Sequence, residues 1–387
     1  MLKLINKKNN IVLILITIIT NYIFFVIPFF ELIIKINFIL FIFFSIFYLI
    51  IYEKNKFLII FIIALIFINL GLLTESWDAR SIWLFKSKQI FFENTILFSK
   101  NNYAQFSHPD YPNIAPAFSA ALAKLVGHWN EIFPKLGFSL MFIPALILLS
   151  KYFDGNKFLI LLSLTIFVIG KYFVNGELDG LISVYFVVSA LIIHKMNFNQ
   201  NNIRSDEFLY LGFAVILTLL KLEGLVLLLC LIITSVFYML VNKKTNYRLM
   251  ILFFISLLPI IMWNLYCFYY DINNANTNYA YSLEGLLSSI YIFKNFTLIT
   301  EYLIFNEKFL LSLIFFVFSV SYYKEKKLFN FVFLVISLYI GALFIVYLST
   351  PLEIEWHLNS SANRVIKPIS LLLFTFGIYN IFNKNIN

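Results

Sequence analysis

Charged residues are scarce in this chain. They make up 13% of its 387 residues, against about 25% in soluble domains, while 61% are hydrophobic and the mean hydropathy is +0.88. No polar stretch is long enough to form a separate soluble domain. We therefore expect a single all-α domain over residues 1–387, embedded in a membrane.

Cysteines and nucleotide-binding motifs are also lacking. The only two cysteines, Cys230 and Cys267, lie in apolar runs without a CxxC pair or a nearby histidine, which excludes a disulfide framework and a thiolate metal site. The sequence contains no GxxxxGK[ST], GxGxxG, GxSxG or HExxH motif, so nothing supports ATP-driven or hydrolytic chemistry. No internal repeat is evident, which counts against transporters built from repeats.

Basic residues are in excess, with a net charge of +9, but this does not indicate a nucleic acid. In a membrane protein, Lys and Arg first set the orientation of the helices. Short loops rich in lysine, such as 53–56, 151–157 and 243–248, fall on one side of the predicted bundle. We expect a multi-pass protein of the cell (inner) membrane with both termini cytoplasmic.

Long apolar runs predict twelve crossings, because about 20 apolar residues cover the hydrocarbon core. The predicted ranges are 11–31, 36–52, 57–74, 136–151, 157–174, 180–195, 208–221, 223–241, 248–270, 302–322, 328–349 and 365–382. The first 56 residues hold two additional N-terminal helices, 74–135 is a large extracytoplasmic loop with interfacial helices, and 136–387 is the remaining bundle. Three of the four histidines and most carboxylates outside the basic loops fall on the extracytoplasmic side, including those of the 271–301 loop.

The segment "ESWDARSIWLFK" (75–86) follows the third crossing. Asp78 is placed to cap a helix from about 79 to 93, since Asp accepts hydrogen bonds from helix N-termini. The alternative is that Asp78 is a general base at the edge of the lipid, where desolvation raises the pKa of a carboxylate. The residues leave both readings open.

The segment "SHPDYPNIAP" (107–116) contains three prolines, which delay the next helix to about Ile114–Gly127. We expect that helix to lie on the membrane. His108 and Asp110 point to opposite sides of an extended chain unless a turn brings them together. Hydrogen bonds that structure the loop are favoured over a metal site, which would need a third ligand.

Two short turns on the same side carry charged residues. "NGELDG" places Glu177 and Asp179 between two glycines, and "KLEG" places Lys221 and Glu223 between two apolar runs. Turn chemistry explains both segments. Ionisable residues at membrane depth nevertheless indicate a functional site. The ammonium group of Lys221 is a compact positive charge on a flexible side chain, which suits binding of a phosphate group.

The last outside segment, "EWHLNSSANR" (355–364), contains His357 and ends at Arg364. We expect Arg364 to begin the final crossing, with Ser360, Ser361 and Asn363 as cap candidates. A helix N-terminus with an arginine and hydroxyl groups predicts an anion site. The alternative is an arginine that snorkels to the interface.

The order of these segments resembles that of GT-C fold glycosyltransferases, in the branch of protein O-mannosyltransferases and aminoarabinose transferases. There, an acidic residue follows a transmembrane helix and begins an amphipathic helix, to which "WDARSIWLFKSKQIFF" is similar. "HPDYPNIAPAFSAALAKLVGHWNEIFPKLGFSLMF" resembles the Pro-rich segment and second helix that follow. "GELDG" resembles a second acidic site, and "SANRVIKP" a late arginine that opens a helix. The resemblance covers about residues 74–382.

The resemblance implies transfer of a sugar from a polyprenyl-phosphate lipid, with inversion, to an acceptor that is a lipid, glycan or protein. Asp78 would be the base, and Lys221 and Arg364 would hold the departing phosphate. The acceptor or sugar pocket would be formed by His108, Asp110, Glu177, Asp179, Glu223 and His357. No cofactor is expected with certainty. "WDAR" lacks the acidic pair of many relatives, so a divalent cation stays open.

Two other functions remain alternatives. An O-antigen polymerase or ligase shares the crossings and the lipid-linked donor, but its large outside loop comes late and is rich in arginine, whereas here it is early. A transporter would place ionisable residues at mid-bilayer depth, and here they cluster at predicted helix ends.

Overall fold

The computed structural model of the chain describes residues 7–27, 30–97, 104, 107–198, 203–243, 246–272, 293–323, 326–350 and 352–382. Within these ranges the regular structure is helical, without strands. The predicted outside loop 271–301 lies largely beyond them, at 273–292, and Pro351 of the last outside segment also falls outside. The prediction of an all-α membrane protein is confirmed.

The helices follow the predicted apolar runs. In chain order they are α1 (Lys7–Val26), α2 (Glu31–Ile51), α3 (Lys56–Gly71), η2 (Ala79–Leu84), α4 (Phe85–Glu93), α5 (Ile114–Val126), α6 (Phe133–Leu140), α7 (Ile143–Tyr152), α8 (Asn156–Ile169), η5 (Gly170–Phe173), α9 (Asp179–Phe198), α10 (Ile203–Leu220), α11 (Leu222–Val241), α12 (Tyr247–Tyr269), α14 (Phe293–Ile304), α15 (Glu307–Tyr323), α16 (Lys326–Leu348), α17 (Ile354–Val365) and α18 (Lys367–Phe382).

Nine helices in the described ranges are long and apolar enough to cross a membrane, or ten if α14 and α15, which bend by 64°, form one span. Each of the twelve predicted crossings falls on a helix. However, the predicted crossings 57–74 and 208–221 fall on α3 and α10, which are not among these nine. The chain is therefore a multi-pass membrane protein, and the count of twelve stays a prediction.

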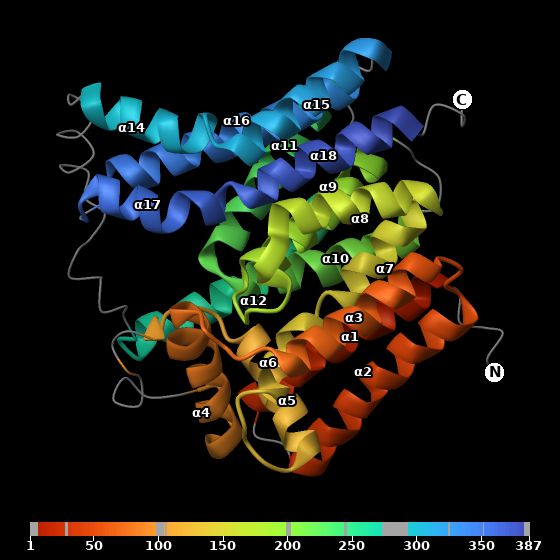
Figure 1. Cartoon of the computed structure of the whole chain (residues 1–387), viewed down its shortest axis with the longest axis vertical. Helices are drawn as coiled ribbons and strands as arrows, with labels where there is room; N and C mark the ends of the chain where they lie inside the picture. The colour runs from red at the N-terminus through yellow and green to blue at the C-terminus, as the bar shows by residue number, and fades with distance from the viewer. Residues whose placement is uncertain are drawn as a thin grey trace.

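The helices run roughly side by side, so the bundle has two ends (Figure 1). α1 begins and α18 ends at the right-hand end of the view, while α4, α14 and α17 reach the left-hand end. At the right-hand end, Lys8 and Lys195 both form ion pairs with the buried Asp206, at 2.7 and 3.1 Å, and Lys151 lies within their electrostatic influence. We call this the basic end. The predicted grouping of these lysines on one side is confirmed.

α5 is enclosed by protein. It packs against α1, α2, α4, α6 and α10, and its residues from Ile114 to Lys124 are all buried. Its predicted bounds, Ile114–Gly127, agree with the structure to one residue. The expectation that it lies on the membrane is wrong, because small side chains such as Ala117 and Ala121 allow neighbouring helices to cover it on every side.

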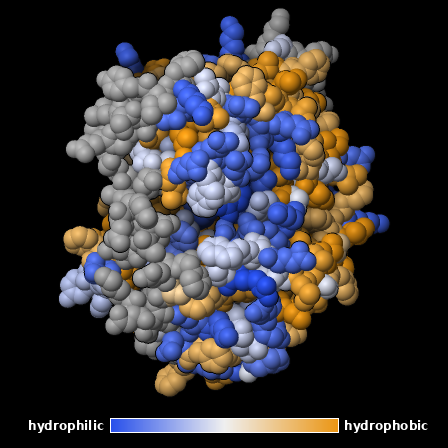
Figure 2. Space-filling model, turned by 60° about the vertical axis from the view of Figure 1, so that its left-hand side comes forward, coloured by the Kyte–Doolittle hydropathy of each residue, from blue (hydrophilic) through white to orange (hydrophobic). Residues whose placement is uncertain are grey.

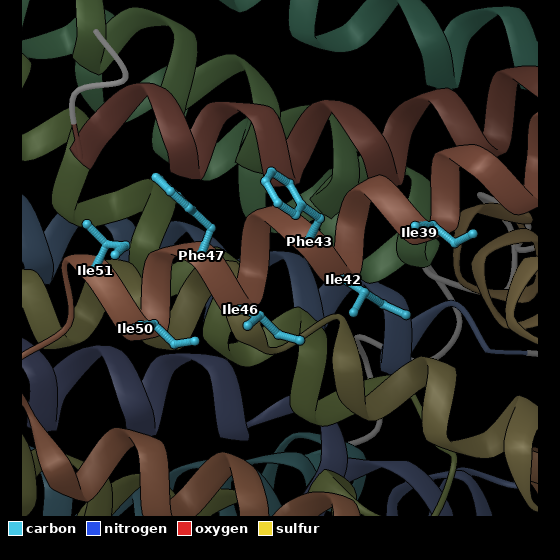
Figure 3. Close-up of a pocket in the computed structure, with 7 residues that line it drawn as sticks. All are labelled: Ile39, Ile42, Phe43, Ile46, Phe47, Ile50 and Ile51. Carbon is cyan, nitrogen blue, oxygen red and sulfur yellow. The ribbon is translucent and has the colours of Figure 1, made fainter. Parts of the chain in front are cut away.

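The exposed face of α2 is apolar. Ile39, Ile42, Phe43, Ile46, Phe47, Ile50 and Ile51 line a shallow groove along it (Figure 3). Several of these side chains are about half exposed, including Phe43 and Ile46. Because an apolar surface of this length would be unfavourable in water, we expect lipid chains to cover it.

The turn between α10 and α11 consists of one residue, Lys221, in extended conformation. Gly224 makes this turn sterically possible. A Cβ atom at position 224 would lie 2.1 Å from the carbonyl oxygen of Leu217, which is far inside van der Waals contact. The glycine therefore lets the first turn of α11 pass directly against the last turn of α10.

Replacement of Gly224 with alanine should force these two helices apart. We expect Gly224→Ala to lower the midpoint of thermal unfolding in detergent by several degrees. Gly341→Ala is the matched control, since position 341 is helical and a Cβ there meets nothing within 4 Å. The control should be neutral or slightly stabilising, because alanine is favoured over glycine in helices by about 1 kcal/mol. Equal effects of the two substitutions would contradict this account of the turn.

Candidate functional site

Asp78 and Arg364 meet at the end of the bundle opposite the basic end. Asp78 directly precedes η2, a turn of π-helix, and its carboxylate Oδ2 accepts a hydrogen bond from Nη1 of Arg364. The two side chains are 25% and 22% exposed, so the pair is accessible from one side. Figure 2 brings the left-hand side of Figure 1 forward, and there hydrophilic side chains gather across the middle of the molecule, with apolar side chains beside them. The segments 75–86 and 355–364, each predicted separately to contribute to the site, are therefore in contact.

Asp78 does not cap the helix that follows it. Its side chain makes no capping hydrogen bond, and the backbone at Asp78 is already helical. The capping interpretation is therefore wrong, because the carboxylate turns to the guanidinium of Arg364 instead. A π-helical turn is rare and often occurs at functional sites.

Arg364 does not begin the final crossing. It lies in the last turn of α17, which starts ten residues earlier, at Ile354. Ser361 and Ser360 are not cap residues either, since both hydroxyl groups donate to the carbonyl oxygen of His357 within the helix. The polar composition of this segment concealed a helix whose C-terminal end suits a cation.

Glu177 lies beside the Asp78–Arg364 pair. Its Oε1 accepts hydrogen bonds from Ser76 and, at 2.9 Å, from Asn175, while its Oε2 is 3.8 Å from Nη1 of Arg364. Gly176 adopts a φ of +84°, which glycine tolerates and which closes the turn. Burial raises the pKa of Glu177 above its usual value, so this carboxyl group binds a proton more readily than an exposed one.

Asp179, Lys221 and Glu223 form a second charged group. The ammonium of Lys221 is 3.5 Å from Asp179 and 2.8 Å from Glu223. Burial alone would lower the pKa of Lys221, but the two carboxylates raise it well above its usual value. Gly180 brings Asp179 close to η5, since a Cβ there would lie 2.8 Å from the carbonyl oxygen of Tyr172.

Three rings stack next to these charges. His108 lies on Tyr111 with ring centroids 4.7 Å apart, and Tyr111 lies on Trp83 at 5.8 Å, both within 18° of parallel. The ammonium nitrogen of Lys221 lies 5.9 Å from the ring centroid of Tyr111. Burial, followed by the charges of Lys86 and Lys221, lowers the pKa of His108 to about 4. His108 is therefore neutral at neutral pH.

Lys86 holds the loop that carries these rings. Its fully buried ammonium donates hydrogen bonds to the carbonyl oxygens of His108 (2.6 Å) and Tyr111 (3.0 Å). The chain turns at Asp110. Without such a turn, the side chains of His108 and Asp110 would point to opposite sides of an extended chain. The carbonyl oxygen of Asp110 accepts from Trp263 at 2.8 Å, and burial raises the pKa of its carboxyl group.

His357 lies farther along the same face. Its Nδ1 is 2.9 Å from the hydroxyl of Thr350, and its ring meets that of Tyr347 edge-on. Both Arg364 and Glu223 influence it electrostatically. The predicted residues thus lie in one neighbourhood, on α9, α11, α17 and the segments that connect the helices.

The centre of this neighbourhood has more carboxylates than cations. In the described ranges, the ion pairs of Asp78, Glu177, Asp179 and Glu223 are formed with two cations, Arg364 and Lys221. Within the described ranges, no three His, Cys, Asp or Glu side chains are placed to hold a metal ion. We call the four acidic residues the carboxylate cluster.

Sequence reasoning missed several members of the site. Lys86, Tyr111, Tyr172, Ser76 and Asn175 were not among the expected residues. Asn175 carried a signal, since an Asx residue two positions before Glu177 can accept its N–H, as it does at 3.0 Å. The position of Lys86 was a second signal that could have been used, because "WLFK" places a lysine on the apolar side of a short helix. The other contacts join segments distant in sequence.

No protein-family model, curated protein or solved structure matches the chain.

The burial of Lys86 predicts that the stability of the folded protein depends on pH. Burial lowers its pKa to about 7 from an ordinary value of 10.5, so between these values the unfolded chain binds one more proton than the folded one. The wild type should therefore become more stable with rising pH relative to Lys86→Gln, with a slope approaching ~1.4 kcal/mol per pH unit. SDS-induced unfolding in mixed micelles from pH 7 to 10 measures this difference.

Lys88→Gln is the matched control, because Lys88 is an exposed lysine on the same helix. A difference between wild type and Lys86→Gln that stays constant over this pH range would contradict the prediction.

The pairing of Lys221 makes a second prediction. Lys221→Met leaves the buried Asp179 without its closest cation, and we expect a loss of about 3–5 kcal/mol in unfolding free energy. Lys221→Met combined with Asp179→Asn should lose less than the sum of the single changes. Additive losses in this double-mutant cycle would show that the two side chains do not depend on each other.

Proposed function

We propose that this protein is a glycosyltransferase that uses a polyprenyl-phosphate sugar. The observation that carries the proposal is the partly exposed Asp78–Arg364 pair, which unites a carboxylate and a potential anion-binding group. Transfer from a lipid phosphate needs both groups, one for the acceptor proton and one for the departing phosphate.

Asp78 is the proposed general base. An acceptor hydroxyl attacks C1 of the sugar while Asp78 takes its proton, and the bond between C1 and the phosphate oxygen breaks with inversion. The polyprenyl phosphate leaves with the electron pair of that bond. The partial exposure of Asp78 gives an acceptor access, and its contact with Arg364 holds the carboxylate in place.

Arg364 is the proposed partner of the departing phosphate. One of its donors serves Asp78, while its buried Nε has no hydrogen-bond partner. A guanidinium has five donors in a fork that suits phosphate. Lys221 is already close to two carboxylates, so its proposed contribution is an electrostatic one at short range.

The remaining residues are proposed to bind the acceptor or the sugar. His108 is neutral and stacked on Tyr111, so it can exchange hydrogen bonds with hydroxyl groups without changing charge. Glu177, Asp179 and Glu223 supply acceptors for sugar hydroxyl groups, and Asp110 and His357 lie at the periphery.

We further propose that the site faces away from the cytoplasm and that the basic end faces it. The lysines around Asp206 support this orientation through the positive-inside rule. The positions of the charged residues count against a transporter, since Asp78, Asp179 and Lys221 occupy helix ends and turns rather than the middle of crossings. No observation favours an O-antigen polymerase or ligase over the proposed transferase.

Asp78→Asn tests the proposed base. It preserves the size and hydrogen-bonding shape of the side chain but removes the ability to accept a proton, so turnover should fall by about 10²–10⁴-fold. The assay follows the release of polyprenyl phosphate from its glycoside by purified protein in detergent.

Glu75→Gln is the matched control, because Glu75 is an exposed carboxylate in the same segment. It should retain turnover close to that of the wild type. If Asp78→Asn also retains it, with folding verified by its thermal midpoint, the assignment of the base is wrong.

A further inference from the structure

Three lysines gather close to the carboxylate cluster without joining it. Lys171 belongs to η5, Lys308 to the first turn of α15 and Lys367 to the first turn of α18. We call these residues the lysine cluster. None of the expected site residues belongs to it.

Two of the three ammonium groups meet at the end of α8, and Lys171 interacts electrostatically with one of them, Lys367. Nζ of Lys308 donates to the carbonyl oxygens of Phe167 (2.8 Å) and Val168 (3.3 Å), and Nζ of Lys367 reaches the same oxygen of Val168 at 3.4 Å. These carbonyl groups belong to the last turn of α8, where the helix leaves acceptors unused. Two ammonium groups therefore share one carbonyl oxygen, although like charges repel.

The ring of Tyr172 joins the two clusters. Nζ of Lys367 lies 4.8 Å and Nζ of Lys171 5.7 Å from its centroid. Tyr172 is also within electrostatic reach of Glu177 and Asp179. A ligand on the lysine cluster would therefore lie next to the carboxylate cluster.

Within the described ranges no carboxylate pairs closely with the lysine cluster, although Asp179 and Glu177 influence Lys367 electrostatically. In the described part of the chain, none of its three ammonium groups forms an ion pair, whereas Arg364 and Lys221 each approach two carboxylates. Lys367 is only 6% exposed, yet its three N–H donors have a single hydrogen bond, of 3.4 Å. A buried cation with unused donors is unfavourable unless an anion compensates it.

Helix capping explains only part of this arrangement. Lysines are favoured at helix C-termini, and Lys308 alone satisfies both carbonyl groups. Capping does not require Lys367 or Lys171. The positive-inside rule does not explain them either, because they lie at the end opposite the basic end around Asp206.

We propose that the lysine cluster binds the phosphate group of an isoprenyl-phosphate lipid. Lys171 and Lys308 would meet the phosphate at the surface, and Lys367 would attract it from beneath. This inference rests on the proposed function and adds to it the ground-state site of the donor phosphate. Arg364, close to Asp78, would then act on the charge that develops during transfer.

The test measures binding of a short-chain isoprenyl phosphate to purified protein in detergent, with the corresponding isoprenol and inorganic phosphate as separate probes. Lys171→Gln and Lys308→Gln should each weaken binding of the isoprenyl phosphate by about tenfold at low salt, and by less at higher salt, because salt screens the lost attraction. Binding of the isoprenol should be unchanged. Comparable affinities for inorganic phosphate and for the lipid would identify the cluster as a general anion site and overturn the proposal for a lipid.

Lys88→Gln is the matched control, since it removes the same charge from an exposed position on α4. Lys367→Gln is a supporting variant whose thermal midpoint is checked first. Unchanged lipid affinity in Lys171→Gln and Lys308→Gln would overturn the inference. If turnover of a donor glycoside still depends on Asp78, the proposed function survives that result. Binding at the lysines with no transfer from any donor glycoside would instead contradict the proposed function.

Discussion

The need to pair charges in an apolar bundle governs this structure. Removing an ionised side chain from water is unfavourable unless an opposite charge and hydrogen bonds replace the water. Arg364 connects α17 to Asp78 and Glu177, and Lys221 connects the α10–α11 turn to Asp179 and Glu223. These contacts join segments that are as much as 286 residues apart. The same interactions therefore determine how the helix ends meet and which chemical groups are exposed between them.

Opposite charges are separated along this end of the molecule. Tyr172 lies within electrostatic reach of Glu177 and Asp179 of the carboxylate cluster, and its ring contacts Lys171 and Lys367 of the lysine cluster. A phosphate is repelled by the first and attracted by the second, whereas hydroxyl groups can donate to carboxylates. A donor that carries both a phosphate and a sugar would therefore have a preferred orientation. The stacked rings of His108, Tyr111 and Trp83 border the same region and provide a rigid wall.

Local chemistry allowed much of the fold to be predicted from the sequence. The prolines of "HPDYPNIAP" marked the start of α5, and the scarcity of charge made the few charged turns conspicuous. The location of Arg364 was not predictable in this way, because a polar segment of serine and asparagine reads as a loop although it is helical here. The partner of Asp78 and the convergence of Lys171, Lys308 and Lys367 depend on tertiary packing, which local patterns do not encode. The enclosure of α5 was missed for the same reason.

The central claim is that a polyprenyl phosphate and its glycoside are the natural ligands of this site. Native mass spectrometry of the protein, purified in mild detergent from the membranes in which it is made, tests this claim most directly. We expect a bound species with the mass of a polyprenyl phosphate or its glycoside, which is displaced by added isoprenyl phosphate. Recovery of ordinary phospholipids alone, together with flux of an unaltered solute in proteoliposomes, would contradict it.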